Sequence, residues 1–240
     1  MNLSMKELRK RNNKDYYSLL SKTMHYLMLY VTKPLLRTNI TPNQISVFWI
    51  ILQLIASYLL IFGTYSLNLV GISLYTIAAL FDYVDGQIAR IKKISTYKGY
   101  YLEDLGIYFG QPIFLLCLGI GTARAFNNPI FFYMGVTSTI AILYRKLAVR
   151  PENYPEEKKK KILKILFNLG SRVKKSKMTN IYLIFRRSNP LNLLFLGLVF
   201  NIPRIVLIVY TLLYLLDMVR MLYVQLNTLH QLDLKNDLFK

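Results

Sequence analysis

The stretch DYVDGQIAR, residues 82–90, sets two carboxylates at the end of an apolar run and decides how the rest of the chain is interpreted. The run before it, SLNLVGISLYTIAALF, is apolar enough to lie in a membrane. On a helix Asp82 and Asp85 share one face, with the small residue Ala89 on the next turn. Acidic residues close to membrane depth are costly unless they face a protein pocket, so this stretch predicts a functional site.

The composition of the whole chain agrees with a membrane location. The 240 residues are 54% hydrophobic, with a mean hydropathy of +0.31 and a net charge of +19. These values are typical of a basic polytopic membrane protein that binds membrane lipids, and the many apolar runs argue against a nucleic-acid partner. Because Cys117 is the only cysteine, the chain forms no internal disulfide and no zinc site built from cysteine.

The apolar runs predict an all-α fold with six transmembrane helices. A break at Asn201-Ile202-Pro203 divides the last long run into two helices. Leucines and methionines at helical spacing in residues 19–31 predict an amphipathic helix that lies at the membrane interface. The six predicted spans cover residues 46–62, 67–81, 99–121, 129–144, 189–201 and 203–224.

The predicted spans divide the chain into three parts. Residues 1–40 form a cytoplasmic and interfacial segment, and residues 41–225 form the six-helix membrane domain, which includes a basic cytoplasmic segment at 145–187. Residues 226–240 form a cytoplasmic tail. The basic segment is interpreted mainly as a solvated surface that attracts lipid headgroups.

The basic residues predict the orientation of these spans. With six spans, all of the 31 Lys and Arg residues except Arg124 and Arg204 fall on one side of the membrane. Because Lys and Arg are retained in the cytoplasm, both termini and the DYVDGQIAR end of the second span should face the cytoplasm. We therefore expect an integral protein of the cell membrane whose active site faces the cytoplasm.

A third carboxylate follows one span later in the sequence. Glu103 lies four residues after Gly99, so the two share a face of the third predicted span. If that span packs beside the second, Glu103 joins Asp82 and Asp85 in one pocket at the cytoplasmic end. Oxygen ligands of this kind suit Mg²⁺ or Mn²⁺, which would in turn hold a phosphate or diphosphate.

A simpler interpretation gives these carboxylates no chemistry. They could end their helices and pair with Arg90, Lys92 and Lys93. The two histidines, His25 and His230, are likewise expected to be ordinary interfacial or exposed residues and not ligands.

A longer pattern favours the functional interpretation. It resembles the signature of the CDP-alcohol phosphotransferases, membrane enzymes that include phosphatidylinositol phosphate and phosphatidylglycerol phosphate synthases. Upstream, NITPNQI at residues 39–45 is similar to the Thr-Pro-Asn opening of the first span in that family. The residues that carry the signature are Asp82-x2-Asp85-Gly86-x2-Ala89-Arg90-x8-Gly99.

The resemblance implies a reaction and roles for residues. An acceptor hydroxyl, on an alcohol or a lipid, displaces CMP from a CDP-linked donor and leaves a phosphodiester, in an enzyme that is a homodimer. The carboxylates of Asp82, Asp85 and Glu103 would hold divalent metal on the donor diphosphate. The implied nucleotide-binding residues are Asp82, Gly86, Ala89, Arg90 and Gly99.

The chain departs from the family pattern at its end. The last aspartate of the family, which is thought to accept the proton of the attacking hydroxyl, corresponds here to Ile107, so the catalytic base is unknown. Glu103 replaces another family aspartate and is one methylene longer. Asp104 is rotated by about 100° from Glu103, and Tyr108 is a poor base near neutral pH.

Three hypotheses follow from this departure. The first is a divergent metal-dependent phosphotransferase of phospholipid biosynthesis. The second is a non-catalytic relative that binds nucleotide or lipid as a scaffold or regulatory subunit. A transporter is disfavoured because the acids cluster at one helix end and do not line a path through the membrane.

Overall fold

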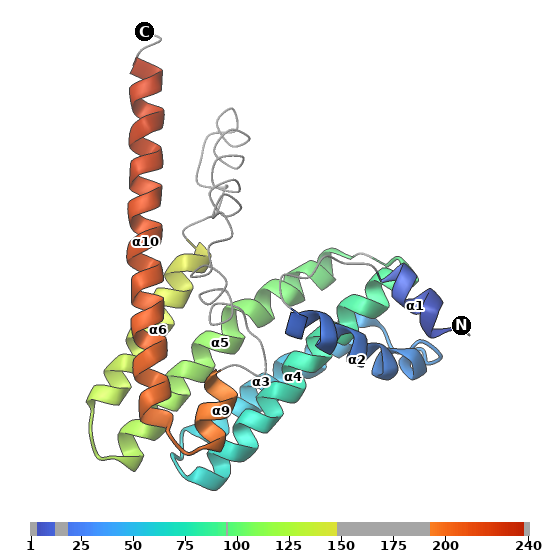
Figure 1. Ribbon diagram of the computed structural model, residues 1–240, viewed down its shortest axis with the longest axis horizontal. Helices are drawn as coiled ribbons and strands as arrows, with labels where there is room; N and C mark the ends of the chain where they lie inside the picture. Colours follow the sequence, from blue (N-terminus) through green and yellow to red (C-terminus); the bar gives the residue numbers. More distant parts are fainter. Residues whose placement is uncertain (1–3, 13–18, 95, 148–192, 238–240) are drawn as a thin grey trace.

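The structure is a computed structural model that describes residues 4–12, 19–94, 96–147 and 193–237. The predicted all-α class is confirmed for these residues, which contain helices and no strand. Figure 1 shows their arrangement. The helices are α1 (Met5–Arg11), α2 (Leu19–Leu35), α3 (Pro42–Leu60), α4 (Tyr65–Lys92), α5 (Tyr97–Ala125), α6 (Ile130–Leu147), α9 (Leu193–Val199) and α10 (Pro203–Asp237).

Four of the described helices are long and apolar enough to cross a membrane. They are α3, α4, α5 and the part of α10 from Pro203 to Asn227. Within α6 only the shorter stretch Ile130–Tyr144 is apolar, and α9 has seven residues. Four spans are therefore supported, whereas the predicted total of six is not confirmed.

Two boundaries of the predicted spans can be compared directly with the helices. The second predicted span does run into the acidic motif, because α4 continues without a break to Lys92. The predicted break at Asn201-Ile202-Pro203 is also confirmed, since α9 ends at Val199 and α10 begins at Pro203. Most of the basic segment 145–187 lies outside the described residues.

The Thr-Pro-Asn sequence starts α3 by a specific mechanism. Thr41 is the N-cap, and its hydroxyl accepts a hydrogen bond from the Gln44 backbone N–H at 3.3 Å. The Gln44 side chain accepts in return from the Thr41 backbone N–H at 2.9 Å, which completes a capping box. Pro42 occupies the first helical position, where its missing N–H costs nothing. The cap therefore fixes where α3 begins.

The packing order of the helices places the acidic motif beside the N-terminal segment. α3 packs against both α4 and α5, α5 against α6, and α6 against α10. α2 lies along the part of α4 that carries the motif, and α1 contacts both of them (Figure 1). α10 extends past the other helices (Figure 1). We call the region where α1, α2 and the starts of α3 and α5 surround residues 82–92 of α4 the motif end.

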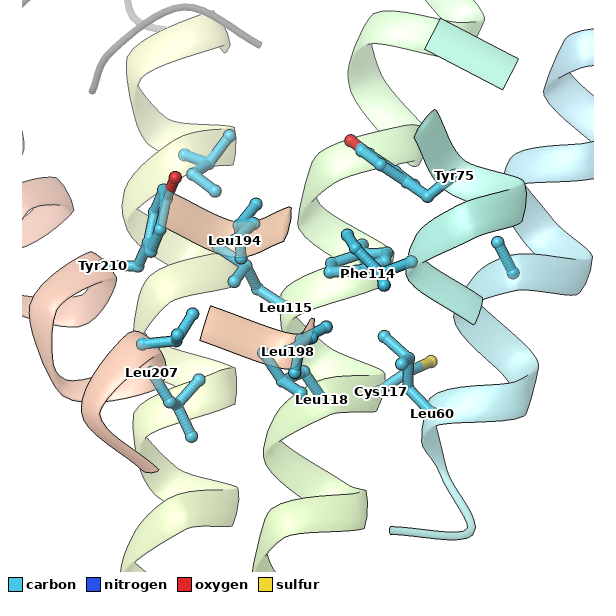
Figure 2. Close-up of a cluster of buried hydrophobic side chains, with 14 of the residues drawn as sticks. Leu60, Tyr75, Phe114, Leu115, Cys117, Leu118, Leu194, Leu198, Leu207 and Tyr210 are labelled. Atoms are coloured by element: carbon cyan, nitrogen blue, oxygen red, sulfur yellow. The ribbon is translucent and has the colours of Figure 1, made fainter. Parts of the chain in front are cut away.

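A second buried region lies toward the other end of α4, and we call it the apolar core. Figure 2 shows Leu194 and Leu198 of α9 among side chains from α5 and α10. Tyr75 and Phe114 stack in it with ring centroids 4.3 Å apart. The apolar core consists of Ala56, Leu60, Ile72, Tyr75, Phe114, Leu115, Cys117, Leu118, Phe131, Ala141, Ile142, Leu194, Leu198, Val206, Leu207, Tyr210 and Tyr214.

Candidate functional site

Asp85 is held from the side by α3. Its Oδ2 atom accepts a hydrogen bond from the Ser46 hydroxyl at 2.6 Å and another from the Trp49 indole Nε1–H at 2.7 Å. Ser46 and Trp49 are three residues apart on α3, so they form one helical face toward Asp85. Two fixed donors on one oxygen hold the carboxylate in a single orientation.

The other two predicted acids are more exposed, and they lie on α4 and α5, which both pack against α3. In the described structure, the predicted packing of the second span directly beside the third is therefore replaced by an arrangement in which α3 contacts both. Asp82 is exposed on α4, and Glu103 is exposed on α5. Glu103 lies close enough to Asp85 for the two carboxylates to repel each other electrostatically. In the part of the chain that the structure describes, no three His, Cys, Asp or Glu side chains form a group that could hold a metal ion.

Arg90 folds back along α4 over Gly86. A Cβ atom built at Gly86 would lie 3.2 Å from the Arg90 Nη1 atom, so a larger residue would push the guanidinium away by a few tenths of an ångström. The Arg90 Nε–H donates to the Asn12 side-chain oxygen at 2.7 Å. The guanidinium of the motif therefore lies between Gly86 and Asn12.

Gly99 lies where the starts of α3 and α5 meet. A Cβ atom at Gly99 would approach the Asn43 Oδ1 and the Thr96 Oγ1 to 3.1 Å each. The Asn43 amide donates to the Thr96 hydroxyl at 3.3 Å, and that hydroxyl caps α5 by accepting from the Gly99 backbone N–H at 3.0 Å. The Thr-Pro-Asn sequence thus links the start of α3 to the glycine of the motif.

Trp49 reaches Asp85 only because α5 carries a glycine beside the indole ring. A Cβ atom at Gly106 would lie 1.9 Å from the Trp49 ring. One turn further, a Cβ at Gly110 would lie 2.2 Å from the Gln53 side-chain oxygen. These two glycines let α3 and α5 approach closely enough for Trp49 to reach α4.

A chain of buried polar side chains joins the motif to the N-terminal helices. The Asn12 amide lies 2.6 Å from His25 Nε2, and the Gln87 amide donates to the His25 backbone oxygen at 2.8 Å. The Gln87 oxygen accepts from the Thr32 hydroxyl at 2.6 Å. We call Asn12, His25, Thr32, Gln87 and Arg90 the polar network. His25 is only 1% exposed, so the prediction of an exposed side chain is wrong, whereas the interfacial position of its helix stays a prediction.

Several residues around the motif are not among those that the sequence singles out. Ser46 and Trp49 of α3 contact Asp85, and Asn12 contacts Arg90. A partial signal exists for the first two, because they follow the Thr-Pro-Asn sequence at helical spacing on the span that precedes the motif. No pattern links Asn12 to a residue 78 positions away.

The position of the missing family aspartate can be located only by its backbone. Ile107 belongs to α5, one helical turn after Glu103, and its side chain lies outside the described part of the structure. The neighbouring candidates differ in exposure. Asp104 is exposed, whereas Tyr108 is partly buried.

The sequence that carries these residues matches a known protein family. The profile of the CDP-alcohol phosphatidyltransferase family matches residues 39–232. The chain belongs to this family. The match begins just before the Thr41 cap and covers the whole acidic motif. A search of curated proteins gave no match to the chain.

Membership in the family gives the general activity. The CDP-alcohol phosphatidyltransferases act in phospholipid synthesis within membranes, and they generally depend on a divalent metal. The four apolar helices agree with an integral membrane protein of this kind. Residues 4–12 and 19–36 of the described structure precede the matched region, although they contact the motif.

Proposed function

We propose that the protein is a phosphotransferase that moves a phospho-alcohol or phosphatidyl group from a CDP-linked donor to an acceptor hydroxyl and releases CMP. The main support is the orientation of Asp85 by Ser46 and Trp49 within a family-matched motif. A carboxylate held by two donors is suited to binding a charged ligand in one fixed position, because little of its own rotational freedom is lost on binding.

The reaction is a displacement at phosphorus. The acceptor oxygen forms a bond to the phosphorus that carries the alcohol or lipid, the bond from that phosphorus to the oxygen bridging to CMP breaks, and CMP leaves. The guanidinium of Arg90, positioned over Gly86, would bind the negative charge of the donor diphosphate. In this proposal the nucleotide binds beside Gly86, Ala89 and Gly99. Gly86 leaves room for the Arg90 guanidinium, and Gly99 leaves room for the Asn43 and Thr96 side chains.

The donor set fits Mg²⁺ or Mn²⁺ in its chemistry. Mg²⁺ is usually bound by one or two carboxylates together with water and substrate phosphates, so a cage of three protein ligands is not required. In this proposal one or two of the carboxylates of Asp82, Asp85 and Glu103 would hold the ion together with the donor phosphates. It would neutralise charge on the diphosphate and polarise the leaving group.

The orientation and assembly of the protein remain part of this proposal. The distribution of Lys and Arg favours a motif end that faces the cytoplasm in the cell membrane, with the basic segment 145–187 on the same side. The division into residues 1–40, 41–225 and 226–240 and the homodimer also remain predictions. Accessibility of a cysteine introduced at Lys93, compared with one at Asn127, measures the orientation directly.

The test of the proposed function is a product assay. Purified protein in detergent is incubated with CDP-diacylglycerol or CDP-alcohols, candidate acceptors and Mg²⁺ or Mn²⁺, and CMP and lipid products are measured. We expect CMP release that requires the metal, the donor and an acceptor together. Tight donor binding with no CMP release from any acceptor would instead select the non-catalytic relative.

Ile107 is the specific observation that favours this alternative. An acid at position 107 would follow Glu103 by one turn of α5, where the family has its presumed base. Loss of a general base typically lowers a rate by about 10²–10⁴-fold. If the enzyme is active but lacks this base, Ile107→Asp should increase CMP release, and the increase should vanish when Asp85 is also changed to Asn. No CMP release from either protein would favour the binding role.

A further inference from the structure

Arg90 depends on a residue outside the family-matched region for its position. Asn12 follows the last residue of α1, and its side-chain oxygen accepts from the Arg90 Nε–H at 2.7 Å. Asn12 is 3% exposed, so water does not readily replace it. Together with the contact over Gly86, this bond helps to position the guanidinium.

The orientation of Asn12 is in turn fixed by His25. Because a guanidinium only donates, the Asn12 side-chain oxygen must face Arg90 and its amide must face His25. That amide lies 2.6 Å from His25 Nε2, so Nε2 is the acceptor in this contact. On the other side of the ring, the Gln87 amide lies 3.2 Å from His25 Nδ1 and donates to the His25 backbone oxygen, so His25 is held between Asn12 and Gln87.

α2 holds His25 against the motif through Gln87. Gln87 is fully buried and uses both ends of its side chain, accepting from Thr32 at 2.6 Å and donating to the His25 backbone oxygen at 2.8 Å. Gln87 lies at a variable position of the motif, between Gly86 and Ala89. The network thus attaches the N-terminal helices to α4 by directional bonds between buried groups, which are costly to leave unpaired.

We propose that Asn12 is a positioning residue for Arg90, that His25 orients Asn12, and that the N-terminal helices thereby set the affinity for the CDP-linked donor. This inference rests on the proposed function, because it takes Arg90 as a ligand of the donor diphosphate. Residues that precede the family-matched region complete the site. Removal of the Asn12 acceptor takes away one of the contacts that position Arg90 over Gly86 and weakens donor binding.

The experiment compares two substitutions at one position. Asn12→Leu has a similar size but no acceptor. Asn12→Asp keeps an acceptor for Arg90, and its second oxygen can accept from a His25 that has taken up a proton at Nε2. Asn68→Leu is the matched control, because Asn68 is also buried on the packed surface of α4 but lies at the opposite end of that helix. Binding of CDP-diacylglycerol in mixed micelles with Mg²⁺ is measured for each full-length protein, with thermal unfolding as the check on folding.

The expected results distinguish an effect on the position of Arg90 from a general effect on helix packing. Asn12→Leu should weaken donor binding by about tenfold or more, since hydrogen bonds to charged groups are among the stronger ones. Asn12→Asp should stay within about threefold of the wild type, and Asn68→Leu should bind like the wild type when folded. In the product assay, Asn12→Leu should raise KM for the donor while KM for the acceptor stays unchanged.

Each failure has a separate meaning. If the wild type binds the donor and folded Asn12→Leu binds it equally well, Asn12 does not position Arg90 and this inference is overturned alone. Equal weakening in Asn12→Leu and Asn12→Asp would also overturn it, because the acceptor would then be irrelevant. If the wild type binds no donor, the proposed function fails and the inference fails with it.

Discussion

The motif end and the apolar core hold the same helices together by different chemistry. In the apolar core, side chains such as Phe114 and Leu118 are buried among other apolar groups. Many weak van der Waals contacts together stabilise this region. At the motif end, buried Gln87 and His25 each have named hydrogen-bond partners. Contacts of the first kind set how stable the protein is, and those of the second kind set where charged groups point.

This contrast predicts that damage to the two regions will be separable. A substitution in the apolar core should lower stability and leave the affinity of the folded molecules for the donor unchanged. A substitution that preserves shape at the motif end should leave stability nearly unchanged and lower the affinity for the donor. Lipid surroundings affect the two regions differently. An apolar group gains little from leaving lipid, so the apolar core is held together by close packing. A polar group has few other partners in lipid, so the hydrogen bonds at the motif end are costly to break.

The largest effect is expected from Asp85→Asn. The variant removes the charge but keeps an oxygen that can accept from Ser46 and Trp49, so the fold should persist. Metal-bound charge stabilisation is worth several kcal/mol, which corresponds to a loss of about 1,000-fold or more in CMP release. Initial rates and metal-dependent donor binding are the measurements. Unchanged metal-dependent binding would eliminate Asp85 as a metal ligand.

The matching test in the apolar core is Phe114→Ala. Phe114 is fully buried and stacks on Tyr75, so truncation leaves a cavity of roughly 100 Å³, which costs about 2 kcal/mol. The melting temperature in detergent should fall, while the folded fraction keeps its donor affinity. A large loss of affinity at temperatures where the variant is folded would show that the two regions are coupled.

The sequence predicts the apolar core and the acidic motif for the same reason. Both depend on local sequence patterns. Apolar runs indicate the spans, and the spacing of Asp82 and Asp85 places them on one face of α4. The Thr-Pro-Asn sequence likewise gives the start of α3 through a cap that involves only neighbouring residues.

The rest depends on contacts between distant segments. His25 has an amphipathic helix around it and therefore resembles an interfacial residue, but α4 supplies Gln87 to bury it. In the sequence, Trp49 resembles an ordinary apolar residue of a span. In the structure, Gly106 on α5 leaves room for its indole ring, which reaches Asp85. The helix predicted at residues 189–201 includes α9, but its packing against α4 and α10 depends on segments that are distant in the sequence.

Trp49→Phe should lower CMP release less than Asp85→Asn does. It changes both a hydrogen bond to Asp85 and the packing between helices. The smaller Phe ring lacks the outer indole atoms that lie beside Gly106, and Asp85 loses one of its two donors on α3. We expect about a tenfold fall in CMP release, the size of one hydrogen bond to a charged group, together with a modest fall in melting temperature from the space left beside Gly106. Tyr58→Phe on the same helix is the control, because Tyr58 is exposed away from the motif end. Equal rates for both variants would mean that the indole N–H is dispensable.

The smallest effect is expected at α1, which carries Asn12 at its C-cap. The Ser4 hydroxyl caps this helix, and the Ser4 backbone N–H donates to Glu7 at 2.8 Å. Ser4→Ala should cost about 1 kcal/mol of local helix stability. Because Leu8 remains fully buried, we expect α1 to stay docked and donor affinity to fall less than in Asn12→Leu. Hydrogen exchange at the Leu8 and Asn12 amides is the measurement.

The same cap should respond to pH in a defined direction. The Ser4 backbone N–H, and then its hydroxyl, stabilise the charged Glu7 carboxylate and hold its pKa below the ordinary value of 4.5. A pKa that is lower in the folded state means that the stabilisation is fully present above the ordinary value and is lost as pH falls through the folded one. Amide exchange in α1, corrected for the intrinsic effect of pH, should therefore increase on acidification below about pH 4. In Glu7→Gln this acid-induced increase should be absent, and if it persists unchanged, another group controls the helix end.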